Sequence, residues 1–169
     1  MGTRGRTNDR KLIFGSNTIH VVKYVKCPVL AVPSSFKKGT PTKILFPTDY
    51  LLPYKRREMK LLSTLAASFV AEITFLHVSK FENLSYRQLD NKVFLESCIE
   101  NNKTECITVK GEELTSTINN YIKTHGIEML VMVNARHSYL ESILYNSTIE
   151  KIGLHLELPF LILQNLQRS

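Results

Sequence analysis

Long apolar runs and paired cysteines are both missing from this sequence. No apolar run approaches the ~20 residues that a membrane-spanning helix needs, so we expect no association with a membrane. The first dozen residues are polar and rich in arginine, and they lack the apolar centre of a secretory signal peptide. The three cysteines, Cys27, Cys98 and Cys106, have spacings that fit neither a zinc site nor a disulfide framework. We therefore expect reduced thiols, no metal site and a cytoplasmic location.

The basic residues are concentrated in two stretches. The formal net charge is +7, and much of it comes from residues 4–11 and 55–57. Such a charge favours anionic partners, but no aromatic side chains that could stack on bases are interleaved with the basic residues of either stretch. An ordinary solvated surface is the preferred interpretation, and nucleic-acid binding is kept as a third hypothesis for function.

Strand-like and helix-like patterns alternate from Lys43 to the end of the chain. Helical periodicity and caps predict helices at 55–70, 83–102, 112–126 and 147–157, with Gly126 closing the third. Short apolar runs predict strands at 43–49, 72–79, 105–111, 127–133 and 158–164, and residues 134–146 are interpreted as a loop. This alternation predicts an α/β fold: a Rossmann-like, open, mostly parallel five-stranded sheet with helices on both faces.

An internal repeat adds a second element to this organisation. Residues 15–33 and 146–164 have the same length, with Gly15 aligned on Asn146 and Pro28 on Pro159. The first copy therefore contains only the last loop, helix and strand of a unit that the second copy presents whole. We interpret residues 1–34 as this remnant, 35–42 as a linker and 43–169 as the complete unit. The remnant helix at 16–26 is then expected to have lost most of the sheet on which it packs.

The glycine spacing of the remnant resembles the C-terminal signature of the universal stress protein family. The signature is a glycine, two residues, a second glycine, nine residues, a third glycine and then serine or threonine; here it is Gly2, Gly5, Gly15 and Ser16. The strand "CPVLAVP" follows it, and "ILFPTD" and "FLHVS" resemble the first two strands of a complete unit. The resemblance implies a tandem-type member of this family, shortened at its N-terminus, with a role in the stress response.

In nucleotide-binding members, an aspartate after the first strand meets the adenosine and the glycine loop wraps the phosphates. The resemblance assigns these roles in the complete unit to the following residues: Asp49, Asn134, His137, Asn146 and Ser147. Because asparagine and histidine replace the loop glycines, we expect a degenerate site and no certain cofactor. Binding of ATP or AMP with magnesium is the alternative, and a turn cap and a ligand are equally open roles for Asp49. The first glycine loop has no acid to complete it and is interpreted as a relic.

No pattern in the sequence indicates an enzyme. No serine, cysteine or lysine is paired with a base as a nucleophile requires, and the resemblance brings no catalytic residue. His77 lies inside an apolar strand and is expected to be a core histidine. The preferred function is a non-catalytic regulatory module that pairs through the strands Pro28–Pro33 and Pro159–Gln164. This pairing is expected either between two chains, as a homodimer, or inside one chain, as a pseudo-dimer.

Overall fold

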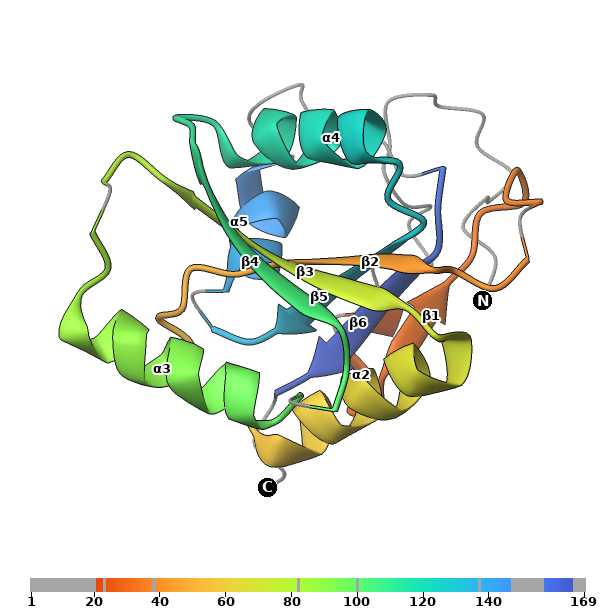
Figure 1. Cartoon of the computed structure of the whole chain (residues 1–169). Coiled ribbons are helices and arrows are strands. Elements are labelled where there is room, and N and C mark those ends of the chain that lie inside the picture. The colour runs from red at the N-terminus through yellow and green to blue at the C-terminus, as the bar shows by residue number, and fades with distance from the viewer. Residues whose placement is uncertain are drawn as a thin grey trace.

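The computed structural model describes residues 21–22, 24–37, 39–81, 83–99, 101–136, 138–146 and 157–165. Its strands are β1 (Val29–Ala31), β2 (Lys43–Pro47), β3 (Glu72–Ser79), β4 (Thr104–Lys110), β5 (Met129–Asn134) and β6 (Phe160–Gln164). They form one six-stranded sheet in the order β1-β6-β5-β2-β3-β4 (Figure 1). All neighbouring strands are parallel except β1, which runs antiparallel to β6 at the edge. The predicted Rossmann-like fold with five parallel strands is confirmed.

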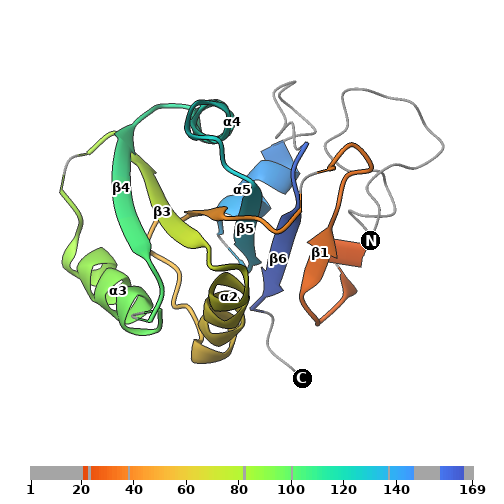
Figure 2. The same cartoon turned by 45° about the vertical axis from the view of Figure 1, so that its right-hand side comes forward.

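Helices cover both faces of the sheet, as the sequence predicts. They are α2 (Arg56–Phe69), α3 (Tyr86–Ser97), α4 (Leu114–His125) and α5 (Tyr139–Asn146). Figure 2 shows α4 and α5 on one face and α2 and α3 on the other. In α4, Gly126 closes the helix in the left-handed conformation with φ 63°, which confirms the predicted cap. Among the described residues, none of the helices combines the length and apolar character needed to cross a bilayer.

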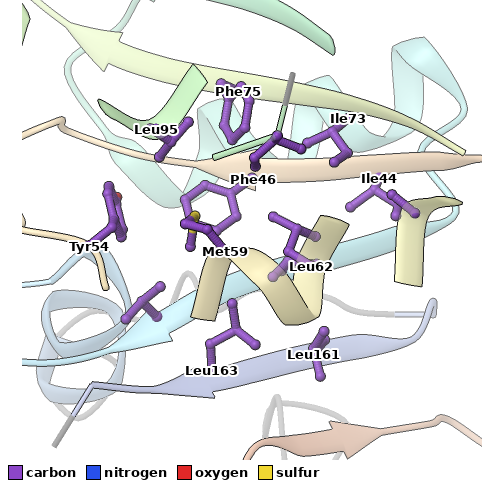
Figure 3. Packing of buried hydrophobic residues seen from close by; sticks show 14 of the residues in the cluster. Ile44, Phe46, Tyr54, Met59, Leu62, Ile73, Phe75, Leu95, Leu161 and Leu163 are labelled. Atoms are coloured by element: carbon purple, nitrogen blue, oxygen red, sulfur yellow. The ribbon is translucent and has the colours of Figure 1, made fainter. Parts of the chain in front are cut away.

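Each face of the sheet has its own hydrophobic core. On the α2 and α3 face, Phe46 lies at the centre of the core, and its ring meets those of Phe75 and Tyr54 edge-on at 5.5 Å in both cases (Figure 3). Helix α2 contributes Met59 and Leu62, both fully buried. Burial of a large apolar side chain stabilises a fold by about 1.5–3 kcal/mol relative to exposure. This core fixes β2, and with it the loop that follows Pro47.

The segment predicted as a loop before the last helix contains α5, so that prediction is wrong in its second half. Ser138 precedes the helix, and its Oγ accepts a hydrogen bond from the backbone N–H of Glu141 at 3.1 Å, as an N-cap does. Leu140 and Ile143 are buried at helical spacing and attach the helix to the sheet. The helix predicted at 147–157 lies outside the described residues except for Glu157.

The described part of the N-terminal segment packs on the main core. Val22 and Ala31 are 2% and 0% exposed and belong to the core on the α4 and α5 face. The helix before β1 was expected to have lost most of the sheet on which it packs, but in its described last turn Val22 lies in the core of the one sheet present. The physical reason is the antiparallel pairing of β1 with β6, which brings this segment over the edge of the same sheet (Figure 2).

Candidate functional site

The carboxyl ends of β2 and β5 are where this fold places a ligand. The chain leaves β2 toward β3 on one side and returns to β5 on the other, so the loops diverge at this point. A small cleft lies there, with a cavity volume of about 10 Å³. Its lining comes from both strands, the loop after β2 and the start of α5: Pro47, Thr48, Asp49, Leu52, Tyr54, Met132, Val133, Ser138, Tyr139 and Leu140.

Two tyrosines, Tyr54 and Tyr139, are among the residues that line this cleft. The hydroxyl of Tyr54 lies 2.6 Å from Thr48 Oγ1, and the Tyr54 ring packs on Phe46. Tyr139 reaches across from α5 and donates a hydrogen bond to the carbonyl of Val78 at 3.0 Å. Burial raises the pKa of both phenols well above the usual tyrosine value, so both stay neutral. The tyrosines thus present uncharged, hydrogen-bonded hydroxyl groups in the lining of the cleft.

Asp49 stabilises the turn after β2. Its Oδ1 accepts a hydrogen bond from the backbone N–H of Leu51 at 2.9 Å, which is an Asx turn. The next residue, Tyr50, is buried and adopts a left-handed conformation with φ 56°. Helix α3 holds both residues from the outside, because Gln88 and Asn91 donate to the carbonyls of Asp49 and Tyr50 at 2.8 and 2.7 Å. Of the two roles open for Asp49, the structure displays the turn cap.

His77 supports the same loop from the sheet. It is 4% exposed, and its Nδ1 lies 3.0 Å from the carbonyl oxygen of Thr48. Its ring also lies 5.4 Å from that of Tyr50. The prediction of a satisfied core histidine is confirmed.

Asn134, at the end of β5, hydrogen bonds away from the cleft. Its Nδ2 donates to the carbonyl of Val22 at 3.0 Å and to Gln164 Oε1 at 2.9 Å. Gln164, at the end of β6, donates from Nε2 to the same Val22 carbonyl at 3.1 Å. We call these three residues the carbonyl clamp. The clamp joins the ends of two strands to the N-terminal segment.

The chain resembles known proteins both in the sequence of its N-terminal residues and in its fold. Residues 1–33 match the model of the Universal stress protein family. The fold matches a universal stress protein from Archaeoglobus fulgidus DSM 4304, with a TM-score of 0.63 and 18% identity over 97% of this chain and 59% of that one. The resemblance to the universal stress protein family is confirmed. The match also means that this chain spans less than two thirds of the length of the Archaeoglobus protein.

Two further universal stress protein structures extend the likeness. One, crystallised in complex with cAMP, has a TM-score of 0.56 and 13% identity over 76% of this chain and all of that one. A Pseudomonas aeruginosa UCBPP-PA14 protein, provisionally assigned to the family, has a TM-score of 0.64 and 14% identity over 97% of this chain and 62% of that one. At these identities the likeness concerns the fold. No curated protein sequence matches the chain significantly.

The universal stress protein pattern is only partly visible in the described site. Asp49 lines the cleft, whereas Asn134 belongs to the carbonyl clamp and is absent from the cleft lining. Asn146 is the last residue of α5, and its side chain lies outside the description. The remaining expected site residues also lie outside the described residues: Gly2, Gly5, Gly15, Ser16, His137 and Ser147.

Tyr54 and Tyr139 are site residues that the sequence patterns do not predict. Both follow the carboxyl end of a predicted strand by a few residues, which is where side chains that line a cleft in this fold arise. An aromatic residue at each of these positions is the signal that could have found them. Within the described residues, no group of three or more metal-ligating side chains occurs near the cleft or elsewhere.

The basic start of α2 surrounds a buried acid. Lys55, Arg56 and Arg57 lie at the N-terminus of the helix, where the helix dipole disfavours positive charge. Glu58 offsets this charge: it is 4% exposed, and its Oε2 accepts from the backbone N–H of Lys55 at 3.2 Å. Glu58 Oε1 has no hydrogen-bond partner within the described part of the chain, and burial raises the pKa of this carboxyl. The same basic stretch contributes to the net charge seen in the sequence.

Proposed function

We propose that this chain is a non-catalytic regulatory module of the universal stress protein type that acts through contacts with other proteins. In this proposal its nucleotide site is degenerate. The observation that carries the proposal is the cleft of about 10 Å³ at the carboxyl ends of β2 and β5. That volume accommodates about one water molecule, whereas ligand pockets usually measure about 300–1,000 Å³.

The contacts of Tyr139 and Asp49 support the degenerate site. A purine could enter only if Tyr139 gave up its hydrogen bond to Val78 and its side chain left the cleft. Asp49 would also have to present a carboxylate oxygen to a ribose while its Oδ1 holds the backbone N–H of Leu51. Breaking these two hydrogen bonds, each of which contributes about 0.5–1.5 kcal/mol net, costs free energy. Contacts with a nucleotide would first have to offset that cost.

Binding of ATP or AMP remains the second candidate function. A universal stress protein with this fold was crystallised in complex with cAMP, and the matched residues 1–33 include the glycine spacing of the family signature. These observations favour a nucleotide ligand in the family, and direct titration of this chain separates the two candidates.

The test is calorimetric titration of the full chain with magnesium-ATP, AMP and cAMP. We expect no binding up to about 1 mM, which corresponds to a binding free energy weaker than about −4 kcal/mol. A dissociation constant near 1 μM, about −8 kcal/mol, would overturn the proposal. In that case Asp49→Ala must abolish binding if the second unit holds the site.

Two variants test which feature prevents nucleotide binding: the side chain of Tyr139 in the cleft, or the replacement of the loop glycines. Tyr139→Ala opens the cleft, and Tyr86→Ala is the matched control because Tyr86 is 89% exposed on α3. Nucleotide binding gained by Tyr139→Ala alone would identify the tyrosine as the cause of the closure. If neither variant binds, the replaced loop glycines are sufficient to abolish the site.

The organisation proposed for the module has three parts. Residues 1–34 are the remnant of a first unit, 35–42 are a linker and 43–169 are the second, complete unit. The alignment of 97% of this chain with 59% of a longer universal stress protein is compatible with this division. Partner contacts are proposed for the β1 and β6 side, and the three free thiols support a reducing, cytoplasmic location.

A further inference from the structure

A second cavity lies at the opposite end of the sheet from the nucleotide cleft. It is enclosed by the amino ends of β2, β3 and β4 and by the last turn of α4. Its volume of about 320 Å³ lies within the usual range of ligand pockets, about 300–1,000 Å³. We call it the amino-end pocket, and these residues define it: Glu72, Thr74, Glu105, Tyr121, His125 and Ile127.

The strands supply the polar floor of the amino-end pocket. Side chains alternate along a strand, and Ile73 belongs to the core on the α2 and α3 face. Its neighbours Glu72 and Thr74 therefore face α4, which covers the other side of the sheet (Figure 2). Glu105 lies directly beside Thr74 in the parallel pairing of β3 with β4. The floor thus contains two carboxylates and one hydroxyl.

Helix α4 supplies an aromatic wall. The rings of Tyr121 and His125 stack, with their centroids 3.9 Å apart and their planes at 7° to each other. Ile127 follows the helix and adds a buried apolar side chain to the lining. The C-terminal end of a helix carries partial negative charge, because its last carbonyls lack helical partners. The wall therefore offers flat apolar contact area beside a helix end that favours a cation.

Two buried hydroxyls in the pocket await a hydrogen-bond partner. Thr74 and Tyr121 are only 7% and 8% exposed, and no described residue hydrogen bonds to Thr74 Oγ1 or Tyr121 Oη. Burial raises the pKa of the Tyr121 phenol, and the negative charges of Glu105 and Glu72 raise it further, so its hydroxyl lies near both carboxylates. Buried polar groups in native proteins are usually satisfied, by the protein, by water or by a ligand.

The basic side chains around the pocket are already engaged. Lys43 Nζ donates to the carbonyl of His125 at 3.2 Å, and Lys103 Nζ lies 3.0 Å from Glu72 Oε2. Glu105 forms no hydrogen bond or ion pair with any described residue. The groups left for a ligand are thus a carboxylate, which only accepts hydrogen bonds, and two hydroxyls, which can accept them. A ligand with positive charge and several donors fits this set, and an anion does not.

We propose that the amino-end pocket binds a small organic cation with a primary ammonium group on an aliphatic stem. The three N–H donors of the ammonium match the carboxylate of Glu105 and the hydroxyls of Thr74 and Tyr121. The stem then lies against the rings of Tyr121 and His125 and against Ile127. The volume of the pocket restricts the ligand to the size of a small metabolite.

This inference goes beyond the proposed function and uses no residue of the nucleotide cleft. The two sites lie at opposite ends of the strands, so their ligands are tested separately. Failure of amine binding would leave the nucleotide titrations unaffected, and nucleotide binding would leave the amine titrations unaffected.

Titration of the full, ¹⁵N-labelled chain with butylammonium tests the proposal. The backbone amide signals of Glu72, Thr74 and Glu105 report on the pocket. Butanol is the matched neutral ligand, and butyrate is the matched anion. We expect the shifts to saturate with a dissociation constant of about 1 mM or lower for butylammonium, and neither control to saturate below about 10 mM.

Variants assign the binding to individual groups. Glu105→Gln removes the charge at nearly constant size and should weaken binding at least about tenfold, because a charge-assisted hydrogen bond is lost. Tyr121→Phe and Thr74→Val each remove a hydroxyl and should weaken binding severalfold. Glu112→Gln is the matched control, since Glu112 follows the other end of β4 and pairs with Lys80 at 3.2 Å on the surface; it should bind like the wild type.

Three results contradict the proposal. If butylammonium gives no saturable shift up to about 10 mM, the pocket does not bind amines. If butanol binds as tightly as butylammonium, the pocket is an apolar cavity without selectivity for a cation. If Glu105→Gln binds as tightly as Glu112→Gln, while its amide spectrum shows the native fold, the ammonium group does not bind at Glu105.

Discussion

Removing one side chain of the carbonyl clamp should destabilise the whole fold. Asn134→Ala deletes the hydrogen bonds to the Val22 carbonyl and to Gln164 Oε1, which measure 3.0 and 2.9 Å. The Val22 carbonyl keeps its second donor, Gln164 Nε2, so its loss is small. Gln164 is only 3% exposed, and its Oε1 loses the donor that Asn134 supplies. One lost hydrogen bond of about 1 kcal/mol and a buried unsatisfied acceptor of about 1–3 kcal/mol give about 2–4 kcal/mol in total.

Urea unfolding followed by circular dichroism measures this loss. With a typical slope of about 1–3 kcal/mol per molar urea, the midpoint should fall by about 1 M or more at unchanged slope. Asn120→Ala is the matched control because Asn120 is exposed on α4, and it should stay within about 0.5 kcal/mol of the wild type.

A double-mutant cycle with Gln164→Leu identifies the partner. The two side chains share a direct hydrogen bond and one acceptor, so their effects should deviate from additivity by at least about 0.5 kcal/mol. If Asn134→Ala unfolds at the same urea concentration as Asn120→Ala, the clamp is not formed in solution and the reasoning is refuted.

Three further outcomes follow from the described contacts. Burial raises the pKa of Glu58, so the folded state binds the proton more tightly and stability falls as the pH rises above the ordinary carboxyl value of about 4.3. Glu58→Gln keeps the capping interaction and should raise the melting temperature at pH 7, with no advantage below pH 4. Phe46→Ala should lose about 3–5 kcal/mol in urea unfolding, because Phe46 is fully buried between two rings; a loss below 1 kcal/mol would contradict this packing. Gly126→Ala should lose about 1 kcal/mol through its positive φ alone, since apart from the adjoining backbone no atom lies within 4 Å of the added carbon, and wild-type stability would argue against the left-handed cap.

The layout of the sheet could be predicted because each element carries its own signal. The strands around Phe46, Phe75 and Val131 are continuous apolar runs, which is the pattern of strands buried on both faces. The end of α4 at Gly126 follows from local chemistry alone. Short-range patterns fail where the signal is weak, as in α5, whose eight residues directly follow a loop-like stretch; among its described side chains, Leu140 and Ile143 are buried.

The details of the site depended on residues far apart in the sequence. Asp49 is the local exception: its position in the sequence is compatible with a cap and with a ligand, and the hydrogen bond from Leu51, two residues away, is what distinguishes the cap. Asn134 finds its partners 112 and 30 positions away, so no local pattern could reveal the clamp. Tyr139 lines the cleft while it donates a hydrogen bond to a carbonyl 61 positions earlier. Contacts of this kind depend on the folded sheet, and a resemblance to a family gives only the positions at which to look for them.

The pairing of β1 with β6 also sets an order of events during synthesis. Leu30 and Leu161 are opposite in the sheet but 131 residues apart in the chain. At about 5–20 residues per second, β1 leaves the ribosome about 7 to 26 s before its partner strand leaves it. During that interval Val22, Val29 and Ala31 have no strand β6 to pack beside. The sheet edge is therefore completed last, and a chaperone that holds short apolar segments would have its best opportunity on this chain while β2 to β5 are being translated.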